Sequence, residues 1–267
     1  MKSFIALALT AAVTAIIVAP ASAATPAAGP DTRTTVILVH GAFADAASWN
    51  GVIPRLDAKG YRVVAAANPL QGVAGDARVV DGLVAQAPGP VVLVGHSYGG
   101  AVISSVQPSP KIQALVYVAA FAPDAGETVL GLTGQFPGST LPGALDAPVA
   151  RADGGEDLYI RQEAFHQQFA ADLPQAQARL MAVGQRPIAK AALEEASAEP
   201  RWKTIPTWAI YGDGDRNIPA QAMEYMAERA GSRGTVVIPG ASHVVMTSHP
   251  QEVADLVDRA ARESARR

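Results

Sequence analysis

The amino-acid sequence predicts an α/β fold: a doubly wound, mostly parallel sheet of six strands, with a small helical cap inserted before the fifth strand. Short apolar runs recur along the chain, and most are continuously apolar, as strands covered on both faces must be. The segments between them have helical spacing, except for one long interval without a strand-like run. The chain has 267 residues, which suits one large domain.

Each element follows from its local pattern. Asp76 is expected to be the N-cap of a helix whose apolar positions lie in 79–87, and Pro250 suits the first turn of a C-terminal helix. Residues 157–197 are expected to be helical, divided by Pro174 and Pro187. The six expected strands are 34–39, 62–66, 91–94, 114–119, 207–211 and 235–238.

The N-terminal 23 residues have the pattern of a cleavable secretory signal. Lys2 is followed by an apolar run over 4–19, and Ala-Ser-Ala at 21–23 fits a signal peptidase site. The run is short for a membrane anchor, and no basic cluster follows it. We therefore expect a secreted or periplasmic protein cut after Ala23, with a flexible lead-in at 24–33, a domain over 34–267 and a cap insertion over about 123–206.

Composition excludes several classes of protein. The chain contains no cysteine, which removes disulfides, cysteine-ligated metals and a cysteine nucleophile. The net charge is −3, with no run of basic residues, so a nucleic-acid partner is not expected. No HExxH motif occurs and no GxGxxG motif follows a strand, so neither a metal nor an organic cofactor is expected.

One motif indicates the chemistry. Residues 91–101 read VVLVGHSYGGA, in which positions 95–99 fit G-x-S-x-G between an expected strand and an expected helix. This context is typical of a nucleophile elbow, with Ser97 at the tip of a strained turn. Gly95 and Gly99 lack side chains and so let the strand and the helix approach each other.

A serine nucleophile needs a base and an acid to orient that base. His243 follows the last expected strand, at the edge of the sheet where such proteins place their active sites, and is the expected base. The acid should lie between them in the chain: Asp215 is the first choice, with Asp213 and Asp124 as alternatives. Among the other histidines, His40 is expected to have a structural role in its loop, and His96 is expected to point away from Ser97.

Two further features concern the substrate. The loop that follows the first strand should supply one oxyanion N–H group, and Tyr98 the other. Phe165 and Phe169 lie four residues apart in the cap, where they either pack the cap onto the sheet or line a pocket. In the second case Phe165, with Phe43 and Tyr98, forms an apolar pocket for small uncharged esters, since no charged residue flanks Ser97 or lies at 42–44.

From about residue 35 to the C-terminus, the chain resembles the α/β-hydrolase superfamily. The resemblance is carried jointly by LVHGAFADAASW (38–49), LVGHSYGG (93–100), VYVAAFAPDAGET (116–128), YGDGDRNIP (211–219) and PGASHVVMTSHPQEV (239–253). It is strongest to the compact branch that contains methyl-salicylate esterases, hydroxynitrile lyases and bacterial pyrethroid-type carboxylesterases. It implies a triad of Ser97, Asp215 and His243, with oxyanion N–H groups from Ala42 and Tyr98. Val244 stands where the lyases carry a lysine, so lyase activity is not expected.

The sequence thus predicts a secreted serine hydrolase that cleaves carboxylic esters through an acyl-enzyme. A lactonase, a thioesterase or a cofactor-free perhydrolase with the same triad is an alternative. An alternative of another class is a non-catalytic binding module on a hydrolase fold, although the complete triad argues against it.

Overall fold

The computed structural model describes residues 32–265. The predicted signal peptide and the lead-in up to residue 31 lie outside the described residues. Within 32–265, no helix has the length and apolar character needed to cross a membrane.

The core of the fold is a sheet of six parallel strands in the order β2-β1-β3-β4-β8-β9. The four central strands are almost entirely buried, as their continuous apolar runs predict. The predicted fold class is therefore confirmed. The strands are β1 (Thr35–Val39), β2 (Arg62–Ala66), β3 (Val91–His96), β4 (Ile112–Val118), β8 (Thr207–Gly212) and β9 (Thr235–Ile238).

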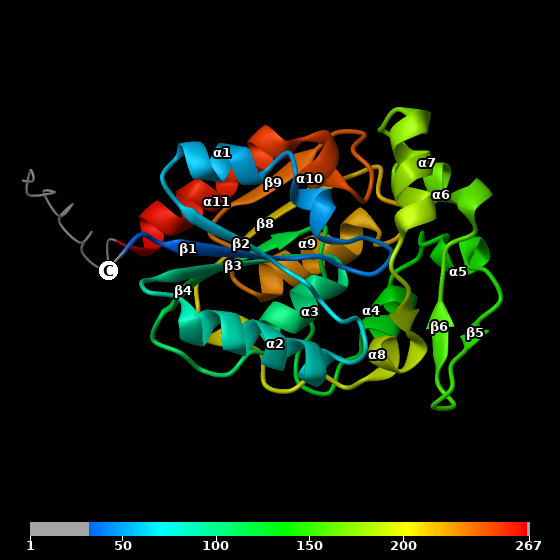
Figure 1. The fold of residues 1–267 in the computed structure, drawn as a ribbon, viewed down its shortest axis with the longest axis horizontal. Coiled ribbons are helices and arrows are strands. Elements are labelled where there is room, and N and C mark those ends of the chain that lie inside the picture. Colours follow the sequence, from blue (N-terminus) through cyan, green and yellow to red (C-terminus); the bar gives the residue numbers. More distant parts are fainter. Residues whose placement is uncertain (1–31, 266–267) are drawn as a thin grey trace, which may run out of the picture. The chain divides into compact units, whose positions relative to one another are not determined.

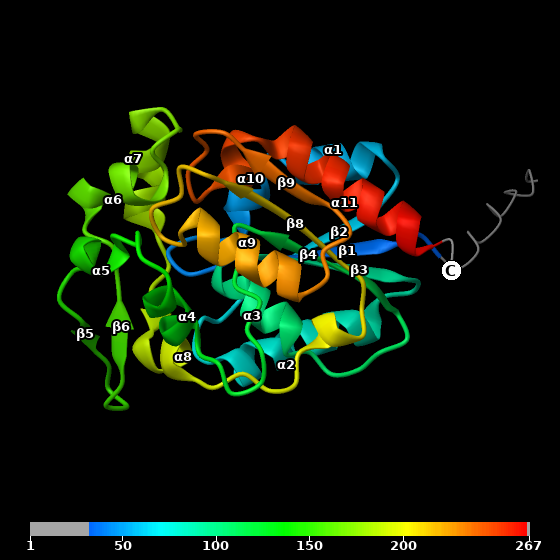
Figure 2. The same ribbon diagram turned by 180° about the vertical axis from the view of Figure 1, so that it is seen from behind.

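Helices cover both faces of this sheet (Figures 1 and 2). One face carries α1 (Ile53–Ala58) and α11 (Pro250–Ser264), and the other carries α2 (Val73–Gln86), α3 (Tyr98–Ser104) and α9 (Ala220–Arg229). The two short helices η1 (Ala46–Trp49) and α10 (Val245–Ser248) lie in the loops that follow β1 and β9. Pro250 is in the first turn of α11, as expected.

The expected N-cap of α2 is wrong. The helix begins at Val73 after Gly72, so Asp76 lies inside its first turn. Its carboxylate accepts hydrogen bonds from the hydroxyl of Tyr98 and from the N–H of Gln71. Asp76 therefore connects the start of α2 to the elbow helix.

The long insertion between β4 and β8 forms the cap, but the cap is not purely helical. A small antiparallel sheet of three strands accompanies its helices. These strands have two or three residues each, too few to show an alternating pattern in the sequence. The cap elements are α4 (Val129–Gln135), α5 (Leu141–Ala144), β5 (Val149–Ala150), β6 (Glu156–Leu158), α6 (Gln162–Phe169), α7 (Gln175–Gly184), β7 (Ile188–Ala189), α8 (Lys190–Glu194) and η2 (Arg201–Lys203).

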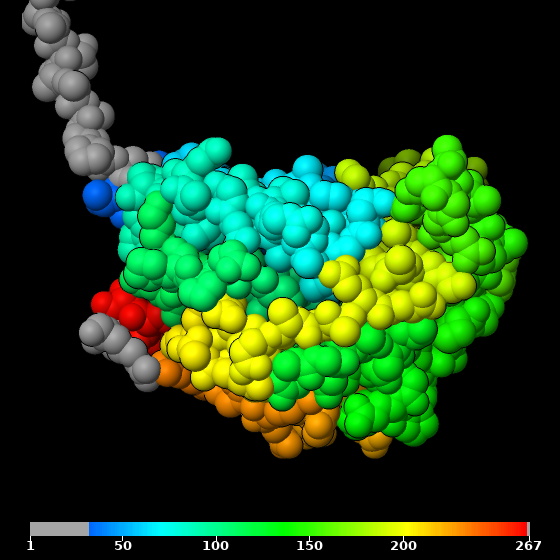
Figure 3. Space-filling view, turned by 90° about the horizontal axis from the view of Figure 1, so that it is seen from below, coloured from blue at the N-terminus to red at the C-terminus, as the bar shows by residue number. Residues whose placement is uncertain are grey.

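The chain then returns from α8 to β8 along the surface. Figure 3 shows this return segment in yellow, between the cyan surface of α2 and the green residues that follow β4. Pro174 stands at the N-cap of α7 and Pro187 precedes β7, so both prolines separate elements as predicted.

The strand order reverses between β1 and β3. The connection after β1 leads to β2 on one side, and the connection after β3 leads to β4 on the other. A crevice forms at such a switch point, beyond the carboxyl ends of the strands. Residues 40–43 and Ser97 meet there, and the loops after β8 and β9 end at the same edge of the sheet.

Candidate active site

Ser97 occupies a strained turn between β3 and α3. Its φ is +54°, a left-handed value that costs a non-glycine residue energy. A Cβ on Gly95 would lie 2.5 Å from the carbonyl oxygen of Gly99, and a Cβ on Gly99 would lie 2.4 Å from that of Val39. Both positions require glycine, because strand and helix touch through their backbones.

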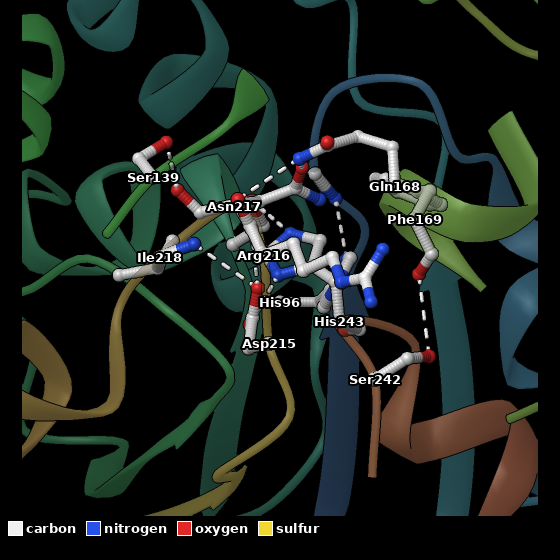
Figure 4. A network of polar contacts seen from close by, with 12 residues as sticks. His96, Ser139, Gln168, Phe169, Asp215, Arg216, Asn217, Ile218, Ser242 and His243 are labelled. Atoms are coloured by element: carbon white, nitrogen blue, oxygen red, sulfur yellow. Dashed lines mark hydrogen bonds and ion pairs between the residues drawn. The ribbon is translucent and has the colours of Figure 1, made fainter. Parts of the chain in front are cut away.

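His243 connects Ser97 to Asp215 through hydrogen bonds, and Figure 4 shows its imidazole beside Asp215. Its Nε2 lies 2.8 Å from the Ser97 Oγ, and its Nδ1 lies 2.6 Å from Oδ2 of Asp215. All three side chains are buried. Because a carboxylate only accepts, Nδ1 carries the proton, and the lone pair of Nε2 faces the serine hydroxyl.

The two alternative acids lie elsewhere. Oδ1 of Asp213 accepts the N–H of Gly240 at 2.5 Å. This hydrogen bond joins the loop after β8 to the loop after β9. Asp124 forms a half-exposed ion pair with Lys203 at 2.6 Å. Of the three candidate acids, only Asp215 forms a hydrogen bond with His243.

The residues expected to supply oxyanion N–H groups lie in the loop after β1 and at the start of α3. Tyr98 is the first residue of α3, so its N–H has no acceptor within the helix. In the loop after β1, the N–H of Gly41 points to Nδ1 of His96 at 3.4 Å, and that of Phe43 donates to the carbonyl of Arg186 at 2.9 Å. Ala42, between them, lines the same cavity as Ser97 and Tyr98.

His96 has a closer connection to the site than its sequence position indicated. Its ring packs against the ring of His243, with centroids 4.8 Å apart. Its Nε2 donates to the carbonyl of His243 at 3.0 Å, so Nδ1 is the acceptor that faces Gly41. Burial and the nearby His243 hold the pKa of His96 well below its ordinary value. A neutral His96 therefore supports the backbone of His243.

His40 has the structural role expected of it. Its Nδ1 donates to the carbonyl of Gly41 at 3.0 Å, and its Nε2 accepts the N–H of Asn68 at 3.2 Å. Burial lowers the pKa of His40, which favours the neutral ring that these two bonds need.

This geometry agrees with comparisons to known proteins. A family model described as the alpha/beta hydrolase family matches residues 36–256. The chain belongs to the alpha/beta hydrolase family. A pyrethroid hydrolase of Sphingobium wenxiniae is 31% identical over 254 residues, which cover 85% of this chain and 87% of that protein.

Solved structures of other hydrolases share the fold. Polyneuridine aldehyde esterase superposes with a TM-score of 0.74 at 19% identity, over 86% of this chain and 100% of that one. A pyrethroid hydrolase from Sphingobium faniae JZ-2 has a TM-score of 0.69 at 26% identity, over 88% of this chain and 100% of that one.

In this hydrolase, a cavity of about 270 Å³ opens onto Ser97 and His243. Phe43 lies in its wall, as predicted, but Phe165 does not. Phe165 is fully buried behind Phe169, with ring centroids 4.9 Å apart. Phe169 is the ring at the wall, 5.1 Å from the ring of His243. The other lining residues are Ala42, Tyr98, Phe121, Val129, Leu130, Thr133, Leu141, Pro142, Leu145, Pro148, Leu158, Lys190, Leu193, Glu194, Asn217 and Ile218.

The charged residues that line the cavity both come from the cap. Lys190 and Glu194 belong to α8, and Lys190 forms an ion pair with Glu156 at 3.0 Å. The remaining wall of this hydrolase site is almost entirely apolar. Within residues 32–265, no group of three or more histidine, aspartate or glutamate residues could hold a metal ion.

Proposed function

We propose that this alpha/beta hydrolase cleaves carboxylic esters, with Ser97 as nucleophile, His243 as general base and acid, and Asp215 as the group that orients the imidazole. The hydrogen-bonded chain from Asp215 through His243 to Ser97, at the wall of an apolar cavity, carries the proposal. The two pyrethroid hydrolases described above, at 31% and 26% identity, support the same reaction class.

The reaction proceeds in two halves. Ser97 Oγ attacks the ester carbonyl carbon while Nε2 of His243 takes its proton, and the N–H groups of Ala42 and Tyr98 stabilise the oxyanion. The imidazolium then protonates the alkoxide, which leaves as the alcohol. Water attacks the acyl-enzyme, gives its proton to His243 and releases the acid, and the proton returns to Ser97.

The cavity favours small, uncharged, apolar esters. A charged group placed against its apolar wall would lose hydration without gaining a partner. Lys190 is already paired with Glu156, and Glu194 would repel a carboxylate, so anionic esters should be poor substrates.

We also propose that the protein is exported. The support is the sequence of residues 1–23, with its basic start, apolar run and Ala-Ser-Ala site. N-terminal sequencing of protein collected outside the cytoplasm should give Ala24 as the first residue. An intact Met1 there would contradict the cleavage.

The reaction class can be tested with a substrate panel and a covalent probe. We expect turnover of p-nitrophenyl acetate, stoichiometric labelling of Ser97 by a fluorophosphonate, and loss of turnover on labelling. Matched thioester and lactone substrates separate the alternative activities from esterase activity. Absence of both labelling and turnover would instead favour a non-catalytic binding module.

A further inference from the structure

Several hydrogen bonds join the cap to the loop that carries Asp215: Ser139 Oγ donates to the carbonyl of Asn217 at 2.8 Å, and the N–H of Thr140 donates to the carbonyl of Arg216 at 3.0 Å. Gln168, in the last turn of α6, adds a buried side chain to these contacts (Figure 4). Its Nε2 donates to the carbonyl of Arg216 at 2.9 Å and to Oδ1 of Asn217 at 2.7 Å. Its Oε1 accepts the hydroxyl of Thr140 at 2.8 Å. One amide thus joins two cap segments to two successive residues of the acid loop.

The orientation of this amide follows from its partners. The carbonyl of Arg216 can only accept, so the nitrogen of Gln168 must face it, and the oxygen must face Thr140. The same nitrogen faces the side chain of Asn217, which must present its oxygen there. The network therefore has a single arrangement, in which every contact of Gln168 is satisfied.

The residues held by Gln168 in turn hold Asp215. Oδ1 of Asp215 accepts the N–H of Asn217 at 2.7 Å and that of Ile218 at 3.0 Å. These two bonds direct the other carboxylate oxygen, Oδ2, at His243. A shift of the peptide units at 216–218 would therefore turn the carboxylate away from the imidazole.

We propose that Gln168 is a positioning residue for the acid, so that the cap takes part in ordering the catalytic groups as well as covering the cavity. This inference rests on the proposed function of Ser97, His243 and Asp215. Gln168 does not line the cavity. Its effect should therefore appear in kcat and much less in KM.

The test compares Gln168→Met with Gln167→Met on p-nitrophenyl acetate. Methionine keeps the length of the side chain and removes its hydrogen bonds. Gln167 is the exposed neighbour on the same helix, and only its backbone carbonyl contacts the acid loop, so Gln167→Met is the matched control. For Gln168→Met we expect kcat to fall roughly 10- to 100-fold with KM within about twofold, and for Gln167→Met we expect no change.

A double-mutant cycle separates positioning from a merely structural role. In an Asp215→Asn background, Gln168→Met should change the residual kcat by less than about twofold, because the group it positions is already lost. An equal loss in both backgrounds, or an unchanged kcat in the first, overturns the proposal. If Gln168→Met does not fold, Thr140→Val, which removes the donor to Oε1, is measured in both backgrounds with the same criterion.

Ser97→Ala is measured alongside as the rate baseline. If Ser97→Ala keeps its activity, the proposed function itself is wrong. If Ser97→Ala is inactive and the Gln168 variants behave like wild type, only the role of Gln168 is refuted.

Discussion

Asp215→Asn should disable His243 without disturbing the geometry of the site. Oδ1 of Asp215 faces two backbone N–H groups, so an asparagine must place its oxygen there and its NH₂ group toward His243. Nδ1 of the imidazole then has to accept a hydrogen bond, and its proton moves to Nε2. That is the atom 2.8 Å from Ser97 Oγ, which loses the lone pair needed to take the serine proton.

The size of the effect follows from this change of tautomer. Stabilising the wrong imidazole tautomer costs about 10⁴ in kcat in a serine protease triad, which corresponds to about 5.5 kcal/mol of transition-state stabilisation. KM should change little, because Asp215 is not part of the cavity wall. The assay is the initial rate on p-nitrophenyl acetate, corrected for Ser97→Ala protein, with thermal unfolding measured in parallel.

The two other candidate acids provide the controls. Asp213→Asn keeps an oxygen for the N–H of Gly240, and Asp124→Asn removes an exposed ion pair, so each should leave kcat within about threefold of wild type. If either lowers kcat as much as Asp215→Asn does, the acid has to be reassigned.

Three other outcomes are expected. Ser97→Ala should lower kcat by about 10⁶ with little change in Tm, since only a hydroxyl is removed; more than a tenth of the wild-type rate would refute the nucleophile. Phe169→Ala should change the order in which p-nitrophenyl esters of different acyl length are preferred, because Phe169 lines the cavity. Phe165→Ala should keep this order of preference, because the Phe165 ring is buried and does not line the cavity, and it should lower the unfolding free energy by about 3–5 kcal/mol. Burial raises the pKa of Asp76, so its contribution to stability is full below about pH 3.9 and declines as pH rises through the higher folded pKa. Unfolding free energies at a series of pH values should therefore shift in favour of Asp76→Asn as the pH rises above about 3.9, and a difference that does not change with pH would contradict the raised pKa.

The sheet was predictable because its strands are buried on both faces and read as continuous apolar runs, such as the five residues of β1. The elbow was predictable because a close backbone contact leaves only glycine at positions 95 and 99. The place of His243 in the chain followed from chain order and from the sheet edge at which parallel strands end.

Other features depend on contacts between distant segments and leave no local pattern. Asp76 looks like a helix cap, but it accepts from the hydroxyl of Tyr98, 22 residues away. Helical spacing places Phe165 and Phe169 on one face, yet only packing against Phe43 and His243 decides which ring reaches the cavity. The contact of His96 with the backbone of His243 joins residues 147 positions apart.

The entry and exit points of the cap have a consequence for the evolution of specificity. The cap leaves the sheet after β4 and returns at β8, and these two strands are hydrogen-bonded neighbours. Because the two strands are parallel, the cap leaves at the carboxyl edge of the sheet and returns at the amino edge. The sheet fixes the positions of both ends, and lengthening the insertion between them costs little, about 0.6 kcal/mol for each doubling of a flexible loop. Natural or designed replacement of the cap can thus alter the cavity wall freely in α4, α5 and α8. A replacement of α6 is constrained, because it must supply a partner for the acid loop or accept a slower enzyme.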